Sequence, residues 1–418
     1  MSISSYVDKV RNMEERIVYA DYNATTPIEP KVKEAFVQAL DYYANASSMH
    51  EDGRAVAKKI EDARESVAAL IGAKPDEVFF TSGGSESNNT VLMLSLSKVL
   101  TSTASFANKY GGKKRVVTTA IEHPCVMESA KHIRDNGIAV DFLPVDSYGV
   151  VDVQKYKSIL EEGKVAKEVD KRVLLASIMM ANNEIGTIEP IKEMADMARE
   201  AGVLFHTDGV QAVGKIPVDV ESLGVDYMTV SCHKIYGPKG IGALYVRRGA
   251  PIDSLIKGGH QERGLRAGTY NAPSIIAFGV AAELAKKRLV QYMEHTSVLR
   301  ERFIEKMKAS IPHIHINGHP SCHLPNTVNI SFPGAEGESI LLRLDLAGIR
   351  VSTGSACASG SLESSHVLLA TGANPEAAHG SIRFSFGLYS TEEDVDYIAS
   401  VMPEIIRWLR SFSTLEVK

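Results

Sequence analysis

Cysteine is scarce in this chain, and the pattern of the few cysteines excludes several classes of protein. Four cysteines (Cys125, Cys232, Cys322 and Cys357) occur in 418 residues. No two of them form a CxxC motif, and none has the spacing to histidine that is typical of a zinc site. We therefore expect neither a disulfide framework nor a bound metal, and we expect a reducing compartment such as the cytoplasm.

Long hydrophobic runs and an excess of charge of one sign are also absent. Charged residues make up 23% of the chain and the formal net charge is -5, which gives no reason to expect nucleic acid as a partner. No apolar stretch approaches the length of a transmembrane helix, and residues 1–20 lack the apolar core of a signal peptide. We expect a soluble cytoplasmic protein that binds neither nucleic acid nor membrane.

The chain is long enough for two domains, and its first two-thirds alternate between short apolar runs and amphipathic helical segments such as 50–73 and 191–201. This alternation predicts a mainly parallel sheet with helices on both faces. In such a fold, ligands bind at the carboxyl ends of the strands. The expected strands are 77–81, 116–119, 174–180, 203–205, 227–230 and 242–246.

After residue 271 the pattern becomes that of a smaller α+β domain. The elements expected there are a long helix at 273–307, strands at 327–332 and 382–386, and a final helix at 392–409. We therefore predict a large domain over residues 20–271, and a small domain built from residues 1–19 and 272–418. Residues 95–112 are polar with little apolar periodicity, and we predict a surface insertion there.

Two of the predicted strands lead to groups that together can bind a cofactor. The run 203–205 leads to Asp208, and the run 227–230 leads to Ser-Cys-His-Lys, which ends at Lys234. An acid and a lysine at the ends of neighbouring strands can hold opposite ends of one flat, charged ring. Pyridoxal phosphate (PLP) needs this arrangement, because a lysine binds its aldehyde and a carboxylate keeps its pyridinium nitrogen protonated. These residues alone leave a PLP site and an ordinary strand-end acid with a surface lysine equally open.

A series of motifs continues along the chain around these residues. They are DYNATTP (21–27), FTSGGSESNN (80–89), IEHP (121–124), ANNEIGT (181–187), HTDGVQAVGK (206–215), SCHKIYGPKG (231–240), GGHQERGLRAGT (258–269), LPNTVNISF (324–332), STGSACASGS (352–361) and SIRFSFG (381–387). In this order they resemble the NifS- and IscS-like cysteine desulfurases of the class V aminotransferase family. The resemblance implies an α/β protein of PLP-dependent transferase fold type I (aspartate-aminotransferase-like), with a mainly parallel seven-stranded sheet in the large domain and a smaller α+β domain.

The resemblance also implies a PLP site and assigns residues to it. Lys234 would bind the cofactor, Asp208 would face the ring nitrogen, and His123 would stack on the ring and exchange protons with the substrate. Asn183 and Gln211 are the expected partners of the ring's 3-hydroxyl. The predicted phosphate ligands are Gly84 and Ser85 in a turn before a helix, Ser231, His233 and, from the neighbouring subunit of a homodimer, Thr269.

The implied substrate site lies partly in the small domain. Arg383 would bind the α-carboxylate of L-cysteine through its guanidinium fork, with Asn183 as a second contact. Cys357, flanked by small residues in a loop at about 352–366, would take the substrate sulfur as a persulfide. The length of this loop matches the desulfurase class in which the cysteine lies on an extended loop.

Other residues in or beside these motifs are expected to be structural. They are Cys125 and Cys232 as packing residues, Asn182 in a turn, Lys239 on the surface, and Arg266 as a weaker candidate for a role in the site. His260 stands where a glycine is common in the family. The C-terminal FSTLEVK shows no clear match to the tail by which close relatives dock an iron–sulfur scaffold, which puts that particular partner in doubt.

The implied reaction converts L-cysteine to L-alanine and leaves the sulfur on Cys357, for transfer to an acceptor protein such as an iron–sulfur scaffold. Either Lys234 or His123 would remove the α-proton. A selenocysteine lyase and a PLP-dependent aminotransferase remain open as alternative enzymes. A non-enzymatic sulfur-assembly subunit is a third alternative, which the presence of Asp208, Lys234, His123 and Arg383 disfavours.

Overall fold

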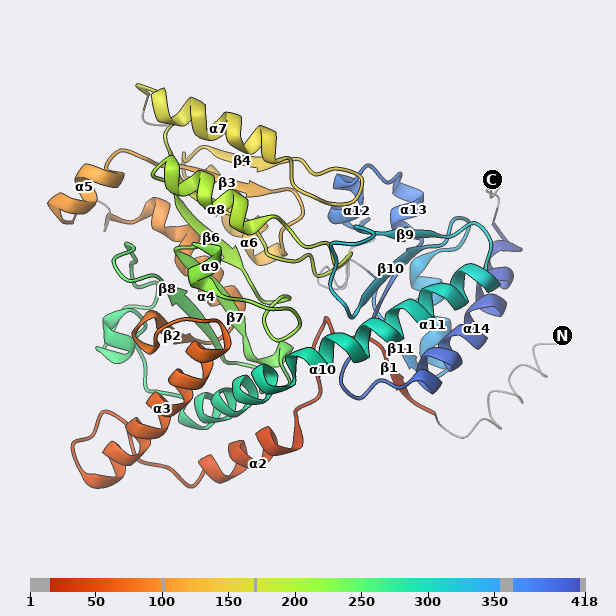
Figure 1. Ribbon diagram of the computed structural model, residues 1–418, viewed down its shortest axis with the longest axis horizontal. Coiled ribbons are helices and arrows are strands. Elements are labelled where there is room, and N and C mark those ends of the chain that lie inside the picture. The colour runs from red at the N-terminus through yellow and green to blue at the C-terminus, as the bar shows by residue number, and fades with distance from the viewer. Residues whose placement is uncertain (1–15, 99–101, 169–170, 354–363, 414–418) are drawn as a thin grey trace.

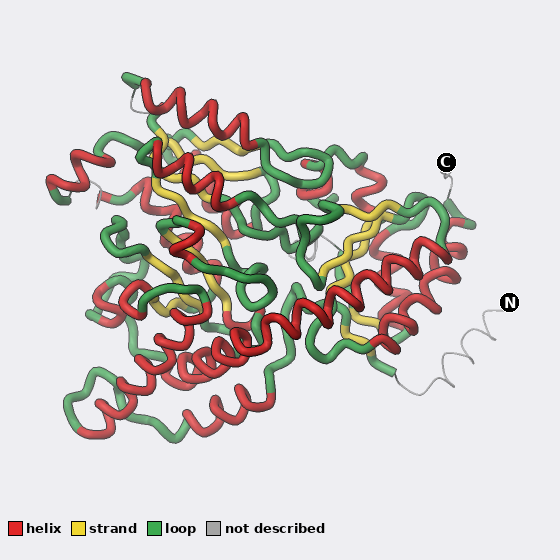
Figure 2. Tube along the Cα trace, viewed as in Figure 1, coloured by secondary structure: helices red, strands yellow, loops and turns green. Residues whose placement is uncertain are grey.

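The computed structural model describes residues 16–98, 102–168, 171–353 and 364–413. Its strands form two separate groups, and the long helix α10 (Ala272–Ser310) runs from the first to the second (Figures 1 and 2). Each group has a buried hydrophobic cluster of its own. The two-part pattern of the sequence therefore corresponds to two packed units, although the exact domain boundaries remain a prediction.

The larger group is a seven-stranded sheet in the order β2-β8-β7-β6-β5-β3-β4. Its strands are β2 (Val78–Thr81), β3 (Arg115–Thr119), β4 (Val140–Leu143), β5 (Val173–Ser177), β6 (Leu204–Asp208), β7 (Tyr227–Ser231) and β8 (Gly242–Val246). Strand β8 runs antiparallel to β7 and β2, and the other pairings are parallel. The predicted mainly parallel, seven-stranded sheet is thus confirmed.

Helices cover both faces of this sheet, which explains why β5 to β8 are buried along their whole length. The helices on one face are α3 (Glu51–Leu70), α7 (Val153–Val165), α8 (Ile191–Glu200) and the first part of α10, and those on the other are α4 (Gly84–Leu92), α5 (Ala104–Tyr110) and α6 (Pro124–Asp135). In α3, the buried residues Val56, Ile60 and Val67 recur at helical spacing, as the sequence predicted.

Short elements complete this domain. They are α2 (Pro30–Ala39), α9 (Val220–Leu223) and the 3-10 helices η1 (Pro75–Glu77), η2 (Met93–Leu96), η5 (Cys232–Lys234) and η6 (Gln261–Gly264). The polar segment 95–112 contains α5, and Tyr110 at the end of this helix is buried in the cluster beneath it. Phe106 of the same helix packs against this cluster as well, so two aromatic residues attach a segment whose sequence shows little apolar periodicity.

The smaller group is an antiparallel sheet in the order β12-β10-β9, next to a parallel pair formed by β1 and β11. Its elements are β1 (Val18–Tyr19), β9 (His315–Asn317), β10 (Thr327–Ser331), α11 (Gly337–Leu346), β11 (Ile349–Arg350), α12 (His366–Ala370), α13 (Pro375–His379), β12 (Ser381–Ser385) and α14 (Glu392–Arg410). Because β1 pairs with β11, the N-terminal part of the chain belongs structurally with the C-terminal part. Among the described residues, none of the helices combines the length and apolar character that crossing a lipid bilayer would require.

Candidate active site

The two polar groups at the strand ends are neighbours in the structure. Asp208 is the last residue of β6, and β6 pairs in parallel with β7, whose last residue is Ser231. Lys234 follows within η5. Neighbouring parallel strands place their carboxyl ends at one edge of the sheet, so the acid and the lysine lie at the edge where ligands bind in folds of this type. The expectation that the two runs are neighbouring strands is confirmed.

The ammonium group of Lys234 is held by main-chain oxygens of the N-terminal segment. Its Nζ donates to the carbonyl of Asn23 at 2.5 Å and to that of Ala24 at 2.8 Å. The segment itself is fixed by Asn23, whose Nδ2 donates to Thr327 Oγ1 at 2.8 Å. The N-terminal segment, anchored on strand β10 of the smaller sheet, therefore fixes the position of the lysine.

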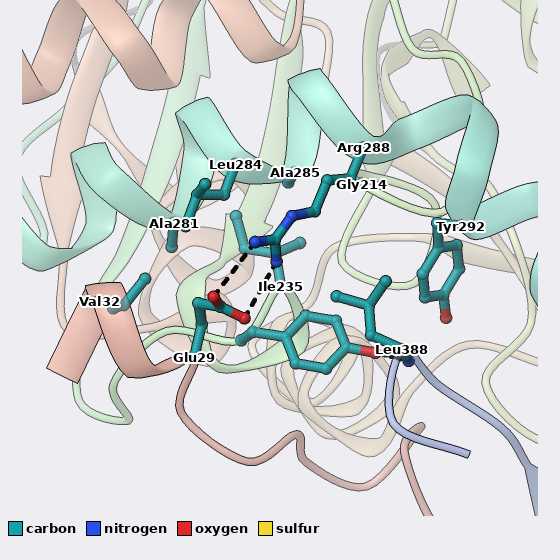
Figure 3. Close-up of a pocket in the computed structure, with 11 residues that line it drawn as sticks. Glu29, Val32, Gly214, Ile235, Ala281, Leu284, Ala285, Arg288, Tyr292 and Leu388 are labelled. Carbon is teal, nitrogen blue, oxygen red and sulfur yellow. Dashed lines mark hydrogen bonds and ion pairs between the residues drawn. The ribbon is translucent and has the colours of Figure 1, made fainter. Parts of the chain in front are cut away.

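The loop after Lys234 packs against the long helix. Ile235 lies in a small apolar pocket with Ala281 and Leu284 of α10, and Figure 3 shows the Glu29–Arg288 ion pair across the same pocket. The next residue, Tyr236, has the left-handed backbone (φ 67°) that a non-glycine residue rarely adopts. Hydrogen bonds from Tyr236 N to Thr26 and from Leu388 N to the Tyr236 hydroxyl keep this conformation in place.

Lys215 is a buried lysine beside the site that the sequence analysis assigned no role. Its side chain donates to Asn23 Oδ1 at 2.9 Å and to Gln211 Oε1 at 2.5 Å, and the residue is only 2% exposed. Burial, with the positive charges of Lys234 and Arg383 adding to it, holds the pKa of Lys215 well below its usual range. Lys215 thus binds the amide oxygen of Gln211, and the amide nitrogen of Gln211 donates to the main-chain carbonyl of Asn23 at 3.0 Å.

Asp208 is held by two donors, neither of which was predicted. Its Oδ2 accepts from Asn88 Nδ2 at 2.7 Å and its Oδ1 accepts from Val210 N at 2.9 Å. Asn88 lies in α4 and is fully buried. Asn88 is the first of two consecutive asparagines in this helix, and only the fold shows which of them points to the strand end.

His123 precedes α6 and caps its first turn. Its Nδ1 accepts from the main-chain N of Cys125 at 3.2 Å and lies 3.0 Å from Cys125 Sγ. Burial lowers the pKa of His123, Lys234 and His366 lower it further, and Asp208 opposes them. The imidazole is therefore neutral at neutral pH. Cys125 is half-buried, as a packing residue would be, but it also contacts this histidine, which the sequence interpretation did not foresee.

The glycine turn and the end of β7 come together as a possible anion cradle. Gly84 is the first residue of α4, and a Cβ built on it would lie 3.1 Å from Val210 Cγ2 and 3.8 Å from Ser231 Cβ. The N–H groups of the first turn of a helix have no partners within that helix and attract anions. His233 Nδ1 lies 3.1 Å from Thr25 Oγ1, and burial lowers the pKa of His233 to about 4. Ser85 is exposed at the same turn.

Arg383 extends from β12 toward the same edge of the large sheet. Its Nη1 donates to the carbonyl of Asn183 at 3.1 Å and its Nη2 donates to Asp21 Oδ1 at 2.6 Å. The residue is 3% exposed, and its Nε is buried without a hydrogen-bond partner among the described residues. A buried guanidinium with an unused donor is able to take a further anionic ligand. The sequence did not predict the Asp21 partner.

Cys357 lies outside the described residues, but both described flanks of its segment contact the site. Ser352 exchanges main-chain hydrogen bonds with Arg383. On the other flank, His366 Nε2 lies 2.9 Å from the carbonyl of Glu122, the residue before His123. The described residues on both sides of this segment therefore lie next to residues of the site.

The remaining predicted residues are either structural or exposed on the surface. Asn182 is a structural turn residue, as expected, since its side chain bonds to the main chain of Ile121, Glu184 and Ile185. Cys232 is fully buried in the core, and Lys239 is exposed. Arg266 forms an ion pair with Glu86 of α4 and is thus structural, whereas Thr269 is exposed on the surface.

Comparison with known proteins places the chain in a family. The aminotransferase class-V family matches residues 18–398. A cysteine desulfurase IscS from Dictyoglomus turgidum is 48% identical over 96% of this chain and 97% of its own length. A solved NifS-like protein is 38% identical, covers 94% of this chain and 100% of its own, and has a TM-score of 0.83. A NifS-like protein from Rickettsia africae has the same coverage, 32% identity and a TM-score of 0.81.

The names of these relatives favour a desulfurase over the selenocysteine lyase and the aminotransferase that the sequence left open. Identity of this level over nearly the whole chain, together with the matching fold and strand-end groups, is decisive. The chain belongs to the aminotransferase class-V family, and within it to the cysteine desulfurases.

Proposed function

We propose that this protein is a PLP-dependent cysteine desulfurase that converts L-cysteine to L-alanine and retains the sulfur as a persulfide on Cys357. The observation that carries the proposal is the convergence of Lys234, Asp208 and His123 at one sheet edge, with Arg383 reaching it from the smaller sheet. A proton-transfer group, an acid, an amine and a carboxylate receptor are the groups that this reaction requires.

The residues at the edge fit PLP at each end of the cofactor. Lys234 would bind the aldehyde, and Asp208, whose carboxylate is oriented by Asn88 and Val210, would face the ring nitrogen. When bound, the cofactor supplies an electron sink for the pair left at the substrate's α-carbon. The cradle for its phosphate would consist of Gly84, Ser85, Ser231 and His233. Asn183 and Gln211 are the proposed partners of its 3-hydroxyl.

The chain's own residues would then orient the substrate and move its protons. The Nε of Arg383 has no hydrogen-bond partner among the described residues, and its Nη2 would become available if the substrate displaced Asp21. These two nitrogens would then offer parallel donors to the α-carboxylate. Asn183, whose carbonyl holds Arg383, lies beside this receptor. Lys234 Nζ and the His123 imidazole are the groups for removing and returning the α-proton.

Cys357 would accept the sulfur. Its Sγ would bond to the substrate sulfur while the bond between that sulfur and the β-carbon breaks, and protonation of the carbon fragment gives alanine. Thr353 is the last described residue before it, and four extended residues span at most about 14 Å. Ser352, the residue before Thr353, is hydrogen-bonded to Arg383. The segment that carries Cys357 therefore starts next to the proposed carboxylate receptor.

Two further proposals concern partners. We propose a homodimer in which Thr269, which is exposed, reaches the cofactor phosphate of the other subunit. We also propose that the protein works in the cytoplasm, where a thiol-based carrier stays reduced, and that it passes sulfur to an acceptor protein such as an iron–sulfur scaffold.

The test is product analysis with L-cysteine and a reductant. The full-length protein with PLP should release equimolar alanine and sulfide, and Lys234→Ala should release neither while remaining folded. Cys357→Ser should bind L-cysteine, as a change in the cofactor's absorbance, but release no sulfide. The exposed Cys322 provides the matched control, since Cys322→Ser should be as active as the wild type. Sulfide released from L-cysteine by Cys357→Ser at the wild-type rate would contradict the persulfide step.

A further inference from the structure

Cys125 connects the histidine of the site to its carboxylate through a chain of hydrogen bonds. Cys125 Sγ lies 3.0 Å from His123 Nδ1 and 3.1 Å from Asn88 Nδ2. The same Nδ2 lies 2.7 Å from Asp208 Oδ2. The amide nitrogen of Asn88 has two hydrogens, so it can donate one to the carboxylate and one to the sulfur. The resulting chain is Asp208–Asn88–Cys125–His123.

The direction of each hydrogen bond follows from the cap of α6. The main-chain N–H of Cys125 points at His123 Nδ1, so this nitrogen carries no hydrogen and acts as an acceptor. The close approach of Cys125 Sγ to the same nitrogen must therefore be an S–H donating to Nδ1. Asn88, as a donor, approaches the sulfur from its other side. In the neutral imidazole the ring proton must then reside on Nε2.

The thiol keeps its proton over the whole physiological range. Burial raises the pKa of Cys125 to about 12, Asp208 and Glu122 raise it as well, and hydrogen bonds from Asn88 and Ser85 lower it. Cys125 is consequently a permanent donor and a poor nucleophile. The sulfur chemistry is left to another cysteine.

We propose that Cys125 is a positioning residue, which together with Asn88 holds His123 in the tautomer with its proton on Nε2. In this tautomer His123 acts as a donor through Nε2 and has no basic nitrogen left for the α-proton, because Nδ1 already accepts hydrogen bonds. Lys234 Nζ then remains as the acceptor for the α-proton. This inference deepens the proposed function and rests on it for its catalytic consequence, but not for the tautomer itself.

Removal of the S–H should make the histidine easier to protonate, since a donor at Nδ1 stabilises the neutral ring. The titratable groups that face His123 are Asp208 from β6, Lys234 from η5 and His366 from α12, and none of them is replaced in a variant of Cys125. In Cys125→Ala the main-chain N–H to Nδ1 also remains. A shift in the protonation of His123 would thus report the loss of the Cys125 side chain and its hydrogen bonds to His123 and Asn88.

The test combines nitrogen NMR of the histidine rings with a pH profile. The holoenzyme is labelled with 15N-histidine, and the signal of His123 is assigned from its loss in His123→Asn. In the wild type at neutral pH, Nδ1 should be unprotonated and Nε2 protonated. In Cys125→Ala, the protonation midpoint of His123 and the acidic limb of kcat/KM for L-cysteine should both move up by roughly half a pH unit, about threefold in rate on that limb.

Two variants separate the proposal from general damage. Cys125→Ser retains a hydroxyl donor and should return both midpoints toward wild type, and Cys322→Ser should change neither. A protonated Nδ1 in the wild type would overturn the proposal, as would midpoints in Cys125→Ala that equal those of the wild type, or a serine variant that shifts as far as the alanine variant. If the protein proves not to release sulfide, the proposed function fails, but the ring nitrogens still decide the tautomer.

Discussion

Asp208 and Lys215 are both buried beside Lys234, and both are held by hydrogen bonds. Asp208 accepts hydrogen bonds from Asn88 and Val210. Lys215 has two acceptors, but burial and the neighbouring positive charges dominate and lower its pKa. At the scale of single residues, the site thus holds its acid in a fixed orientation at one end and disfavours a second positive charge beside the amine at the other.

The position of Asp208 at the strand end leads to a prediction about proton transfer. Asp208→Asn replaces one carboxylate oxygen with an NH2 group, which faces either Asn88 or Val210 and cannot hold a proton on the ring nitrogen. We expect exchange of the α-proton of L-cysteine with solvent to slow by about 100-fold, while the fold persists. Deuterium incorporation measured by mass spectrometry checks the rate, and thermal unfolding checks the fold. The exposed Asp62→Asn is the control, and normal exchange in Asp208→Asn would remove the acid from the mechanism.

A second residue-scale prediction concerns Glu189, a buried carboxyl group away from the site. Its Oε2 accepts from Val151 N at 2.9 Å and its Oε1 has no partner among the described residues. Burial raises the pKa of Glu189 to about 8, from 4.5 in the unfolded chain, with Asp146 adding and Val151 opposing. The protonated form is therefore favoured in the folded state, so this stability is present below pH 4.5 and is lost as the pH rises toward 8.

Glu189→Gln removes that titration and keeps an acceptor for Val151. The free energy of unfolding of the wild type should therefore fall relative to that of the variant between pH 5 and 8, by at most about 1.4 kcal/mol for each pH unit. Denaturant unfolding at a series of pH values measures the difference. A constant difference across this range would show that the carboxyl group is ionised in the folded protein.

At the scale of elements, α10 packs tightly on α3 through small residues. A Cβ built on Gly279 of α10 would lie 2.6 Å from Ala63 Cα and 2.7 Å from Ala63 Cβ, which no side-chain rotation can relieve. The sequence shows only a glycine in a helix, where it lowers helix propensity. Its benefit arises from the close approach of the two helices.

Gly279→Ala should therefore destabilise the protein although alanine is the better helix former. We expect a loss of about 1 to 3 kcal/mol in the free energy of unfolding, because the two backbones must move apart. Chemical unfolding followed by circular dichroism measures it, and the exposed Lys287→Ala in the same helix should have little effect. A more stable Gly279→Ala protein would mean that helix propensity outweighs this contact.

At the scale of the whole molecule, several exposed apolar side chains follow one another along the end of α2 and the segment that joins it to α3. Val37 is 55% exposed, Leu40 58%, and Tyr43 and Met49 90% each. Exposed apolar side chains can mark a surface that another protein covers. Together with the exposed Thr269, they support the proposed homodimer.

We predict a particle of twice the 45.4 kDa chain mass in solution. The double variant Val37→Glu and Leu40→Glu places charges on the apolar surface and should shift the protein toward monomer with lower PLP occupancy, since Thr269 would no longer reach the second site. Sedimentation and the cofactor's absorbance measure the two effects. A wild-type monomer with full PLP occupancy and activity would contradict the shared site.

The sequence predicted the features that depend on local pattern. The alternation of apolar runs and helices gave the parallel sheet, and the strand-end positions of Asp208 and Lys234 gave the candidate site. The resemblance to cysteine desulfurases added His123 and Arg383, which no local pattern singles out. Their roles, like that of Cys357 outside the described residues, stay predictions.

The sequence by itself determined the fold class and the two groups at opposite ends of the site, Asp208 and Lys234, because hydrophobic periodicity and strand-end chemistry act over a few neighbouring residues. The tertiary structure alone decided which other residues contact and orient the groups of the site. Asn88 meets Asp208 across 120 positions, and Arg383 meets Asp21 across 362. Burial lowers the pKa of Lys215, whose Nζ donates to Asn23, and Cys125 contacts His123 because a helix begins between them. Burial and contacts between distant segments set these charges and hydrogen bonds, and they exist only once the chain has folded.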